Sequence, residues 1–328
     1  MHVLVTGGAG FIGSHLCEWL IKDGSQVTVV DNLSTGNLNN IRHLLNHTKF
    51  QFVKDSVLNT ETVHVLVDKC DLIIHLAAAV GVDLIVKRPV QTIETNIRGT
   101  EFVLEIANKF AKKVILASTS EIYGKNTEVP FSEDMDRIMG STMFSRWSYA
   151  TSKAIDEFLG LAYHREYGLP VVITRFFNTV GPRQTGQYGM VIPRFVEAAL
   201  DDQPIIIYGS GKQSRCFGYI DDVINGIMAL VQEPKAEGEV FNIGADEEIT
   251  IEELAIKIKA MIGSRSEIKR IPYEEAYGMP FDDMLRRVPD LSRIKNLVGY
   301  SPRFTLDMTL QNIIAYYEEK VRSCRDTA

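Results

Sequence analysis

Cysteine is scarce in this sequence, and its spacing follows no disulfide or metal-binding pattern. The 328 residues include only Cys17, Cys70, Cys216 and Cys324, and no two of them form a C-x-x-C pair. The seven histidines contain no H-E-x-x-H motif either. These absences argue against the common zinc-binding patterns, so we predict reduced structural thiols and no metal site.

Positive charge and long apolar segments are also lacking. The net charge of -7 and the pI near 5.6 leave no basic surface of the kind that nucleic-acid binding requires. No segment approaches the ~20 apolar residues that span a membrane, and the N-terminal stretch carries no basic leader. With 45% hydrophobic and 23% charged residues, the chain is expected to be a globular cytoplasmic protein without nucleic-acid or membrane partners.

What the first half does contain is a regular alternation of short apolar runs and longer amphipathic segments. The runs predicted to be buried strands are 2–5, 26–30, 50–53, 72–77, 113–118 and 170–176. Such alternation indicates repeated β-α units. It predicts an α/β fold with a Rossmann-type, doubly wound parallel sheet.

A glycine-rich loop, VTGGAGFIGSH, follows the first predicted strand. Gly7, Gly10 and Gly13 give a spacing that allows a tight turn and lets a pyrophosphate approach the free N–H groups of a helix N-terminus. Asp31 ends the second predicted strand, where a carboxylate accepts hydrogen bonds from an adenosine ribose and repels a 2'-phosphate. The sequence therefore predicts NAD rather than NADP. Asp55, after the third strand, is expected either to reach the adenine or to cap the following helix.

The regular alternation ends after about residue 177, where the predicted elements are shorter and are separated by Pro and Gly. We predict an NAD-binding Rossmann domain over residues 1–176, to which a segment at about 215–242 returns. Residues 177–328 are predicted to form a smaller, mixed α/β substrate-binding domain. Because no long linker joins the two parts, we expect them to share a cleft.

Tyr149 and Lys153 lie four positions apart in WSYATSK, a segment predicted to be helical, so they share one helical face. A phenol is a weak base at neutral pH, but a nearby ammonium brings its pKa towards the working range. The hydroxyls of Ser118, Thr119 and Ser120 follow the fifth predicted strand, at the edge where doubly wound sheets bind ligands. Together these residues predict a site that removes a proton from a bound hydroxyl.

The combined motifs resemble the extended short-chain dehydrogenase/reductase family that modifies nucleotide-diphosphate sugars. Besides the glycine loop and Asp31, the resemblance is carried by HLAA (75–78), STSEIYG (118–124), YATSK (149–153) and RFFNTVGPRQ (175–184). It covers nearly the whole chain. The resemblance implies a tightly held NAD that removes a hydride from the sugar, usually at C4, and later returns it.

The resemblance also assigns roles to individual residues. Tyr149 is the expected base, Lys153 lowers its pKa and binds the nicotinamide ribose, and Thr119 is the hydroxyl partner. The expected cofactor contacts are Gly7, Gly10, Phe11, Ile12, Gly13, Asp31, Asn32, Ser34, Asp55, Ser56, Leu76, Ala77, Ala78, Ser118, Tyr149, Lys153 and Phe176. The expected contacts to the nucleotide-diphosphate sugar are Thr119, Ser120, Asn178, Arg194, Tyr208, Arg215 and Arg287, where arginine suits phosphate through its planar fork of donors.

Three reactions are open to a 4-keto sugar, and the motifs divide between them. It can be reduced on its other face to a C4 epimer, lose water across C5 and C6, or lose a C6 carboxylate as carbon dioxide. The motif STSEIYG, which contains Glu121, is similar to the motif of GDP-mannose dehydratases and UDP-glucuronate decarboxylases. The R-x-P-D stretch from Arg287 to Asp290 also resembles the decarboxylases. YATSK is nearer to the epimerases, and Ile85 or one of its neighbours lies where decarboxylases carry a tyrosine.

From this balance we predict an NAD-dependent UDP-sugar 4-epimerase. The alternatives are a UDP-glucuronate decarboxylase and an NDP-sugar 4,6-dehydratase, both using Glu121 as a further catalytic group. A non-catalytic NAD-binding sensor or scaffold is a different class. Its members typically lack the tyrosine or the lysine of the helix pair, and this chain has both.

The helix that begins near Tyr149 is apolar on more than one face. The residues concerned are Ile155, Phe158, Leu159, Leu161, Ala162 and Tyr163. Some of this surface needs a partner besides the helix's own sheet. Since relatives pair such helices, we predict a homodimer.

Overall fold

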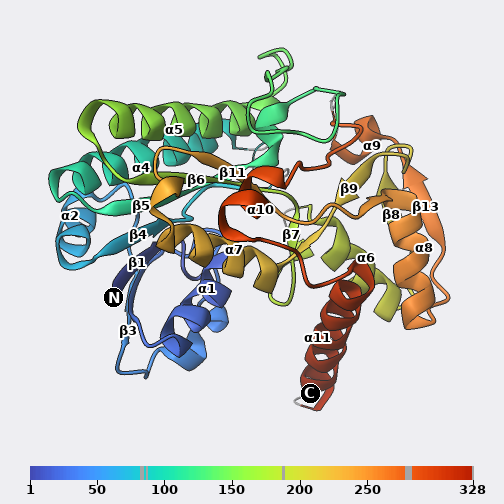
Figure 1. Ribbon diagram of the computed structural model, residues 1–328. Helices are drawn as coiled ribbons and strands as arrows, with labels where there is room; N and C mark the ends of the chain where they lie inside the picture. Colours follow the sequence, from blue (N-terminus) through green and yellow to red (C-terminus); the bar gives the residue numbers. More distant parts are fainter. Residues whose placement is uncertain (82–84, 86–87, 187–188, 278–282, 327–328) are drawn as a thin grey trace.

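A sheet of seven parallel strands forms the centre of the molecule. The computed structural model describes residues 1–81, 85, 88–186, 189–277 and 283–326 (Figure 1). In sheet order the strands are β11 (Val240–Ile243), β6 (Val171–Phe176), β5 (Lys113–Thr119), β4 (Leu72–His75), β1 (His2–Thr6), β2 (Gln26–Val30) and β3 (Phe50–Val53). Six of them are the strands predicted from the sequence, and the α/β doubly wound class is confirmed.

Helices cover both faces of this sheet. One layer consists of α1 (Phe11–Lys22), α7 (Ile220–Gln232) and α10 (Ser292–Val298), and the other of α2 (Thr60–Lys69), α4 (Pro89–Lys109) and α5 (Arg146–Tyr167) (Figure 1). Side chains alternate between the layers: Val3 and Val5 belong to one hydrophobic cluster, and Leu4 belongs to the other. Burial on both faces explains why the strands are continuously apolar.

The remaining elements form a smaller, mixed part beside the sheet. Its helices are α6 (Val191–Leu200), α8 (Ile251–Ile262), α9 (Tyr273–Tyr277) and α11 (Leu306–Asp326). Its two-stranded sheets pair β7 (Thr179–Val180) with β10 (Gly218–Tyr219), β9 (Ser214–Cys216) with β12 (Glu248–Thr250), and β8 (Ile205–Tyr208) with β13 (Ile268–Ile271). The division into domains at residue 176 stays a prediction. Within the described ranges, no helix has both the length and the apolar character of a membrane span.

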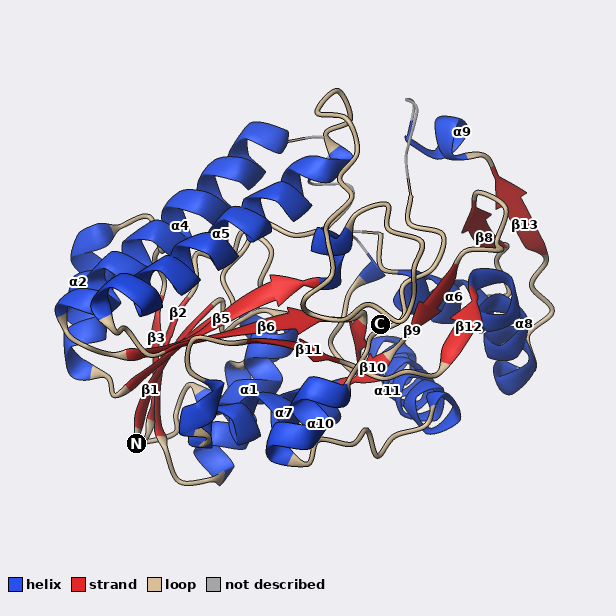
Figure 2. Ribbon diagram, turned by 45° about the horizontal axis from the view of Figure 1, so that its top comes forward, coloured by secondary structure: helices blue, strands red, loops and turns tan. Residues whose placement is uncertain are grey.

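The order of the strands creates a crevice. β1 and β4 are neighbours in the sheet, although β2 and β3 lie between them in the sequence. The chain therefore leaves β1 towards one edge and later returns to build the other, and ligands bind at the carboxyl ends where this reversal occurs. In Figure 2 the arrowheads of β5 and β6 point towards the part that contains α6 and α8.

The outer surface of α5 is only partly covered. Phe158 is 64% exposed and Ile155 is 42% exposed. Leu159, Leu161 and Tyr163, which the sequence grouped with them, instead pack against the hydrophobic cluster under α5. The homodimer stays a prediction, and it now depends on fewer apolar side chains than the sequence suggested.

Candidate active site

A cavity of about 790 Å³ lies at the carboxyl ends of the strands and is lined by both parts of the chain. It brings together every residue predicted for cofactor and substrate except Ser120. Ser120 is buried beside the cavity, and its hydroxyl has no hydrogen-bond partner within the described chain. The cavity thus combines the predicted residues in one place, while the role of each stays a prediction.

The glycine loop has the backbone that a bound pyrophosphate requires. Gly7 has φ of +72°, and a Cβ atom there would lie 2.8 Å from the backbone nitrogen of Ala77. Gly10 caps the N-terminus of α1, so the first N–H groups of that helix face the cavity side of the loop. These features fit a dinucleotide.

Asp31 is held in place by the same loop. Its carboxylate accepts hydrogen bonds from the backbone N–H groups of Ala9, at 3.0 Å, and Leu33, at 2.8 Å. Burial raises the pKa of Asp31, and the two N–H donors oppose that rise. Asp55 differs: its carboxylate accepts hydrogen bonds from the Asn59 amide and the Thr62 hydroxyl at the start of α2, as well as lining the cavity.

Tyr149 and Lys153 project from one face of α5 into the cavity, and both are almost fully buried. Burial raises the pKa of the Tyr149 phenol, and the carboxylates of Glu121 and Asp156 raise it further. A hydrogen bond with the Thr119 hydroxyl acts in the opposite direction. In this arrangement the phenol is protonated.

Glu121 lies directly after β5 and joins a buried ion pair. Its carboxylate is bonded to the Arg146 guanidinium on one side and lies 3.7 Å from the Arg287 guanidinium on the other. Burial alone would raise the pKa of Glu121, but Arg146 and then Arg287 lower it below its usual value. Glu121 is therefore ionised.

Arg146 is a site residue that the sequence reasoning missed. It is 3% exposed and begins α5, three positions before Tyr149. A cation is disfavoured at a helix N-terminus, because the helix dipole is positive there. An arginine at this unfavourable position, on the same helical face as Tyr149, could have identified Arg146 as a site residue from the sequence.

Two further residues complete the charged end of the cavity. Arg215 forms a bidentate pair with Asp283, with distances of 3.0 and 3.1 Å, and Tyr273 donates a hydrogen bond to Asp283 at 2.8 Å. Sequence reasoning also missed Asp283. Arg194 lies elsewhere on the wall, 4.1 Å from the centre of the Tyr208 ring.

We call Glu121, Arg146, Arg215, Asp283 and Arg287 the arginine cluster. Its three cations exceed its two carboxylates by one charge, and all three arginines are less than 9% exposed. Burial, followed by repulsion from Arg215, lowers the pKa of Arg287 to about 10. Among its described members the cluster therefore carries one more positive than negative charge, a balance that favours an anionic ligand.

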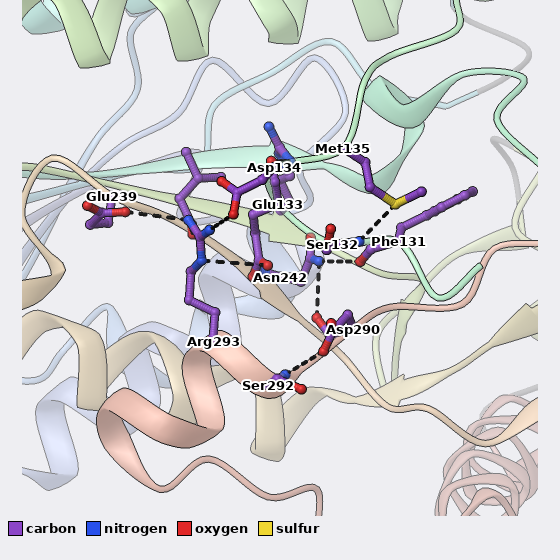
Figure 3. A network of polar contacts seen from close by, with 12 residues as sticks. Phe131, Ser132, Glu133, Asp134, Met135, Glu239, Asn242, Asp290, Ser292 and Arg293 are labelled. Atoms are coloured by element: carbon purple, nitrogen blue, oxygen red, sulfur yellow. Dashed lines mark hydrogen bonds and ion pairs between the residues drawn. The ribbon is translucent and has the colours of Figure 1, made fainter. Parts of the chain in front are cut away.

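A hydrogen-bond network fixes the segment that carries Arg287. Figure 3 shows Asn242 of β11 between Phe131 and Asp290, and its amide donates to their carbonyl oxygens at 2.8 and 3.1 Å. Tyr123, in the loop that carries Glu121, donates to the Asn242 side-chain oxygen at 2.8 Å. The network thus ties Glu121 and Arg287, distant in sequence, to the same strand.

Comparison with known proteins shows which family this chain belongs to. The family described as GDP-mannose 4,6 dehydratase matches residues 4–313. The chain belongs to the extended short-chain dehydrogenase/reductase family of nucleotide-sugar epimerases and dehydratases. This membership confirms the resemblance seen in the sequence.

Several relatives in this family are named for acidic sugars. A UDP-N-acetyl-alpha-D-glucosaminuronate decarboxylase of Bacillus cytotoxicus is 43% identical over 96% of this chain and 97% of its own length. UDP-glucuronic acid decarboxylase 1 of Danio rerio is 35% identical over 97% of this chain and 73% of its own length. The crystal structure of a Bacillus cereus UDP-glucuronic acid 4-epimerase, in complex with UDP-glucuronic acid and NAD, is 32% identical. It superposes with a TM-score of 0.88 over 97% of this chain and 99% of that one.

Proposed function

We propose that the protein decarboxylates a UDP-hexuronic acid to a UDP-pentose, with UDP-N-acetylglucosaminuronate as the first candidate substrate. The observation that carries this proposal is the arginine cluster, which has one unmatched positive charge beside Tyr149 and Thr119. The 43% identical decarboxylase supports the N-acetylated substrate. The decarboxylase alternative of the sequence analysis thus replaces the epimerase as our main hypothesis.

A sugar carboxylate suits this part of the cavity for electrostatic reasons. A buried carboxylate needs an opposite charge and hydrogen-bond donors, and guanidinium groups supply both. Arg146 and Arg287 face Glu121 next to the predicted base. A neutral UDP-hexose carries negative charge only on its diphosphate, so its sugar ring would place only hydroxyl groups against these cations.

The residues around the glycine loop fit NAD, which accepts a hydride from the sugar and returns it. In our proposal Gly7 and the N-terminus of α1 hold the pyrophosphate, and Asp31 holds the adenosine ribose. Lys153 binds the nicotinamide ribose. A carboxylate at Asp31 would repel the 2'-phosphate of NADP.

The chain's own groups then manage protons and charge. In the proposed reaction the Lys153 ammonium favours the phenolate of Tyr149, and this phenolate, hydrogen-bonded to Thr119, takes the proton of the sugar 4-hydroxyl as C4 becomes a ketone. The substrate is now a β-keto acid, so the C5–C6 bond breaks, carbon dioxide leaves, and the electron pair forms an enolate whose charge rests on the C4 oxygen. Tyr149 and Thr119 stabilise that oxygen. C5 then gains a proton, and the ketone is reduced back to the alcohol.

C4 epimerisation of the same acidic sugar is the second candidate. Ile85, buried in the cavity wall, offers a sugar carboxylate no hydrogen bond. The structurally similar Bacillus cereus protein is named a UDP-glucuronic acid 4-epimerase. An arginine cluster could also hold a carboxylate that stays in place.

The test is a substrate panel in deuterated water with products identified by NMR. The panel contains UDP-N-acetylglucosaminuronate, UDP-glucuronate and the two corresponding neutral UDP-sugars. We expect a UDP-pentose with deuterium at C5 from an acidic substrate and no product from the neutral ones. A C4 epimer that keeps its carboxylate would establish epimerisation instead, and loss of water would establish dehydration. Tyr149→Phe is the control, since it should abolish turnover.

A further inference from the structure

The predicted base, Tyr149, lies on α5 between two residues that form buried ion pairs: Arg146, which pairs with Glu121, and Lys153, which pairs with Asp156. Arg146, Tyr149, Lys153 and Asp156 follow one another at spacings of three, four and three residues, so they share a helical face. The Lys153 ammonium lies 2.7 Å from the Asp156 carboxylate, and their side chains are 3% and 1% exposed. The function proposed above gives Asp156 no role.

We infer that Asp156 is a positioning residue, which directs the Lys153 ammonium towards the cofactor and the phenol. A lysine ammonium has three N–H donors. One is bonded to Asp156, which leaves two for the nicotinamide ribose and for groups near Tyr149. A lysine side chain is flexible, so a fixed counter-ion also restricts where its charge lies.

No other carboxylate near this helix face can replace Asp156 in the described chain. Glu157 forms a 2.8 Å ion pair with Arg175, and Glu121 pairs with Arg146. A buried ammonium without a counter-ion is costly and tends to lose its proton. Asp156 therefore supplies the negative charge that Lys153 needs.

Asp156 is itself anchored to other elements. The Thr100 hydroxyl of α4 forms a hydrogen bond with it and lies 3.3 Å from Nε2 of His75 on β4. Nδ1 of His75 lies 2.8 Å from the Thr6 hydroxyl, which accepts a hydrogen bond from the Ala77 N–H at the cavity wall. These contacts connect Asp156 to the ends of β1 and β4.

The charges around this group give a defined pH effect. Burial, and then Lys153, lowers the pKa of His75 to about 3, so the imidazole is neutral. Burial raises the pKa of Asp156, while the Lys153 ammonium and the Thr100 hydroxyl oppose that rise. Asp156 and Glu121 raise the pKa of Tyr149, whereas Arg146 lowers it. Removing a negative charge lowers the pKa of every neighbouring group. Loss of the Asp156 charge should therefore move the whole pH–activity profile to lower pH.

Asp156→Asn tests this inference because it keeps the shape of the side chain and removes its charge. Glu166→Gln is the matched control, since it removes an exposed carboxylate from the same helix. We measure the pH dependence of turnover on any accepted UDP-sugar, the NAD retained after purification, and the thermal midpoint. For Asp156→Asn we expect a pH profile shifted down by about one pH unit, about tenfold lower turnover at the optimum of that profile, and less retained NAD.

Asp156→Glu should recover part of each loss, and Glu166→Gln should match the parent protein. An Asp156→Asn protein with unchanged pH profile and NAD content, altered only in thermal midpoint, would overturn the inference. If Asp156→Asn does not fold, Thr100→Val keeps the charge and loosens its anchor. Thr100→Val should then lower the amount of retained NAD without shifting the pH–activity profile. Full retention of NAD by this variant would contradict the inference. None of these readouts depends on which reaction follows C4 oxidation, so they fail separately from the proposed function.

Discussion

The Arg146 guanidinium and the Glu121 carboxylate form a buried ion pair beside the Tyr149 phenol. Neither residue is isolated, because Glu121 also faces Arg287 and Arg146 begins the helix that carries Tyr149. The pair thus joins the predicted base to the charged end of the cavity. Its charges are the basis of our proposal that the site binds an acidic sugar.

Arg146→Gln should remove the excess charge of the arginine cluster. We expect kcat/KM for a UDP-hexuronate to fall about 100-fold, since a buried charge-assisted interaction is lost. The amount of retained NAD should stay constant, because Arg146 lies at the sugar end. Steady-state kinetics and cofactor analysis measure both, with the exposed Arg165→Gln as control. Equal losses in the two variants would contradict the role of Arg146.

Glu121→Gln should show its effect in the pH dependence of stability. The pKa of Glu121 is lowered in the folded protein, below the ordinary value of 4.5. Its contribution is therefore fully present above pH 4.5 and is lost as the pH falls through the lower folded value. We expect the variant to be about 3 kcal/mol less stable at pH 7, with a smaller difference at pH 4. Chemical denaturation at both pH values measures this, and a pH-independent difference would argue against an ionised Glu121.

Gly7→Ala and Gly168→Ala form a matched pair. Both glycines have φ of +72°, but a Cβ atom meets the Ala77 backbone at Gly7 and nothing within 4 Å at Gly168. Both variants should lose about 1 kcal/mol of stability from backbone strain. Only Gly7→Ala should also lose NAD, measured by cofactor content after gel filtration. Retention of NAD by Gly7→Ala would show that the loop does not hold the pyrophosphate.

Phe158→Glu tests the predicted homodimer. Phe158 on α5 is 64% exposed, with the Arg137 guanidinium 5.2 Å from its ring centre. A charge in the centre of an apolar interface should separate the subunits. We expect light scattering at micromolar concentration to give a dimer for the parent protein and a monomer for the variant. A monomeric parent protein would refute the dimer.

The sequence predicted the features that depend on neighbouring residues. Six strands, the glycine loop and the spacing of Tyr149 and Lys153 follow from local periodicity, and the structure contains each of them. Contacts between distant segments could not be predicted. Arg146 pairs with Glu121 across 25 positions, and Arg215 pairs with Asp283 across 68.

The same limit affected the choice of reaction. The motif YATSK contains the predicted base and its lysine, which act in the proposed proton transfer. What happens to the ketone depends on charged side chains that come together only in the folded protein. In the sequence, YATSK and Ile85 together favoured an epimerase. The arginine cluster, assembled from α5, β9 and the segment that follows α9, changes the balance.

The most direct test of the proposed decarboxylation follows the C6 carbon itself. UDP-N-acetylglucosaminuronate labelled with carbon-13 at C6 is incubated with the purified protein, and the label is followed by NMR. We predict that the label leaves the nucleotide sugar as carbon dioxide and bicarbonate, in equal amount to the UDP-pentose formed. A label that stays on a converted sugar would contradict decarboxylation.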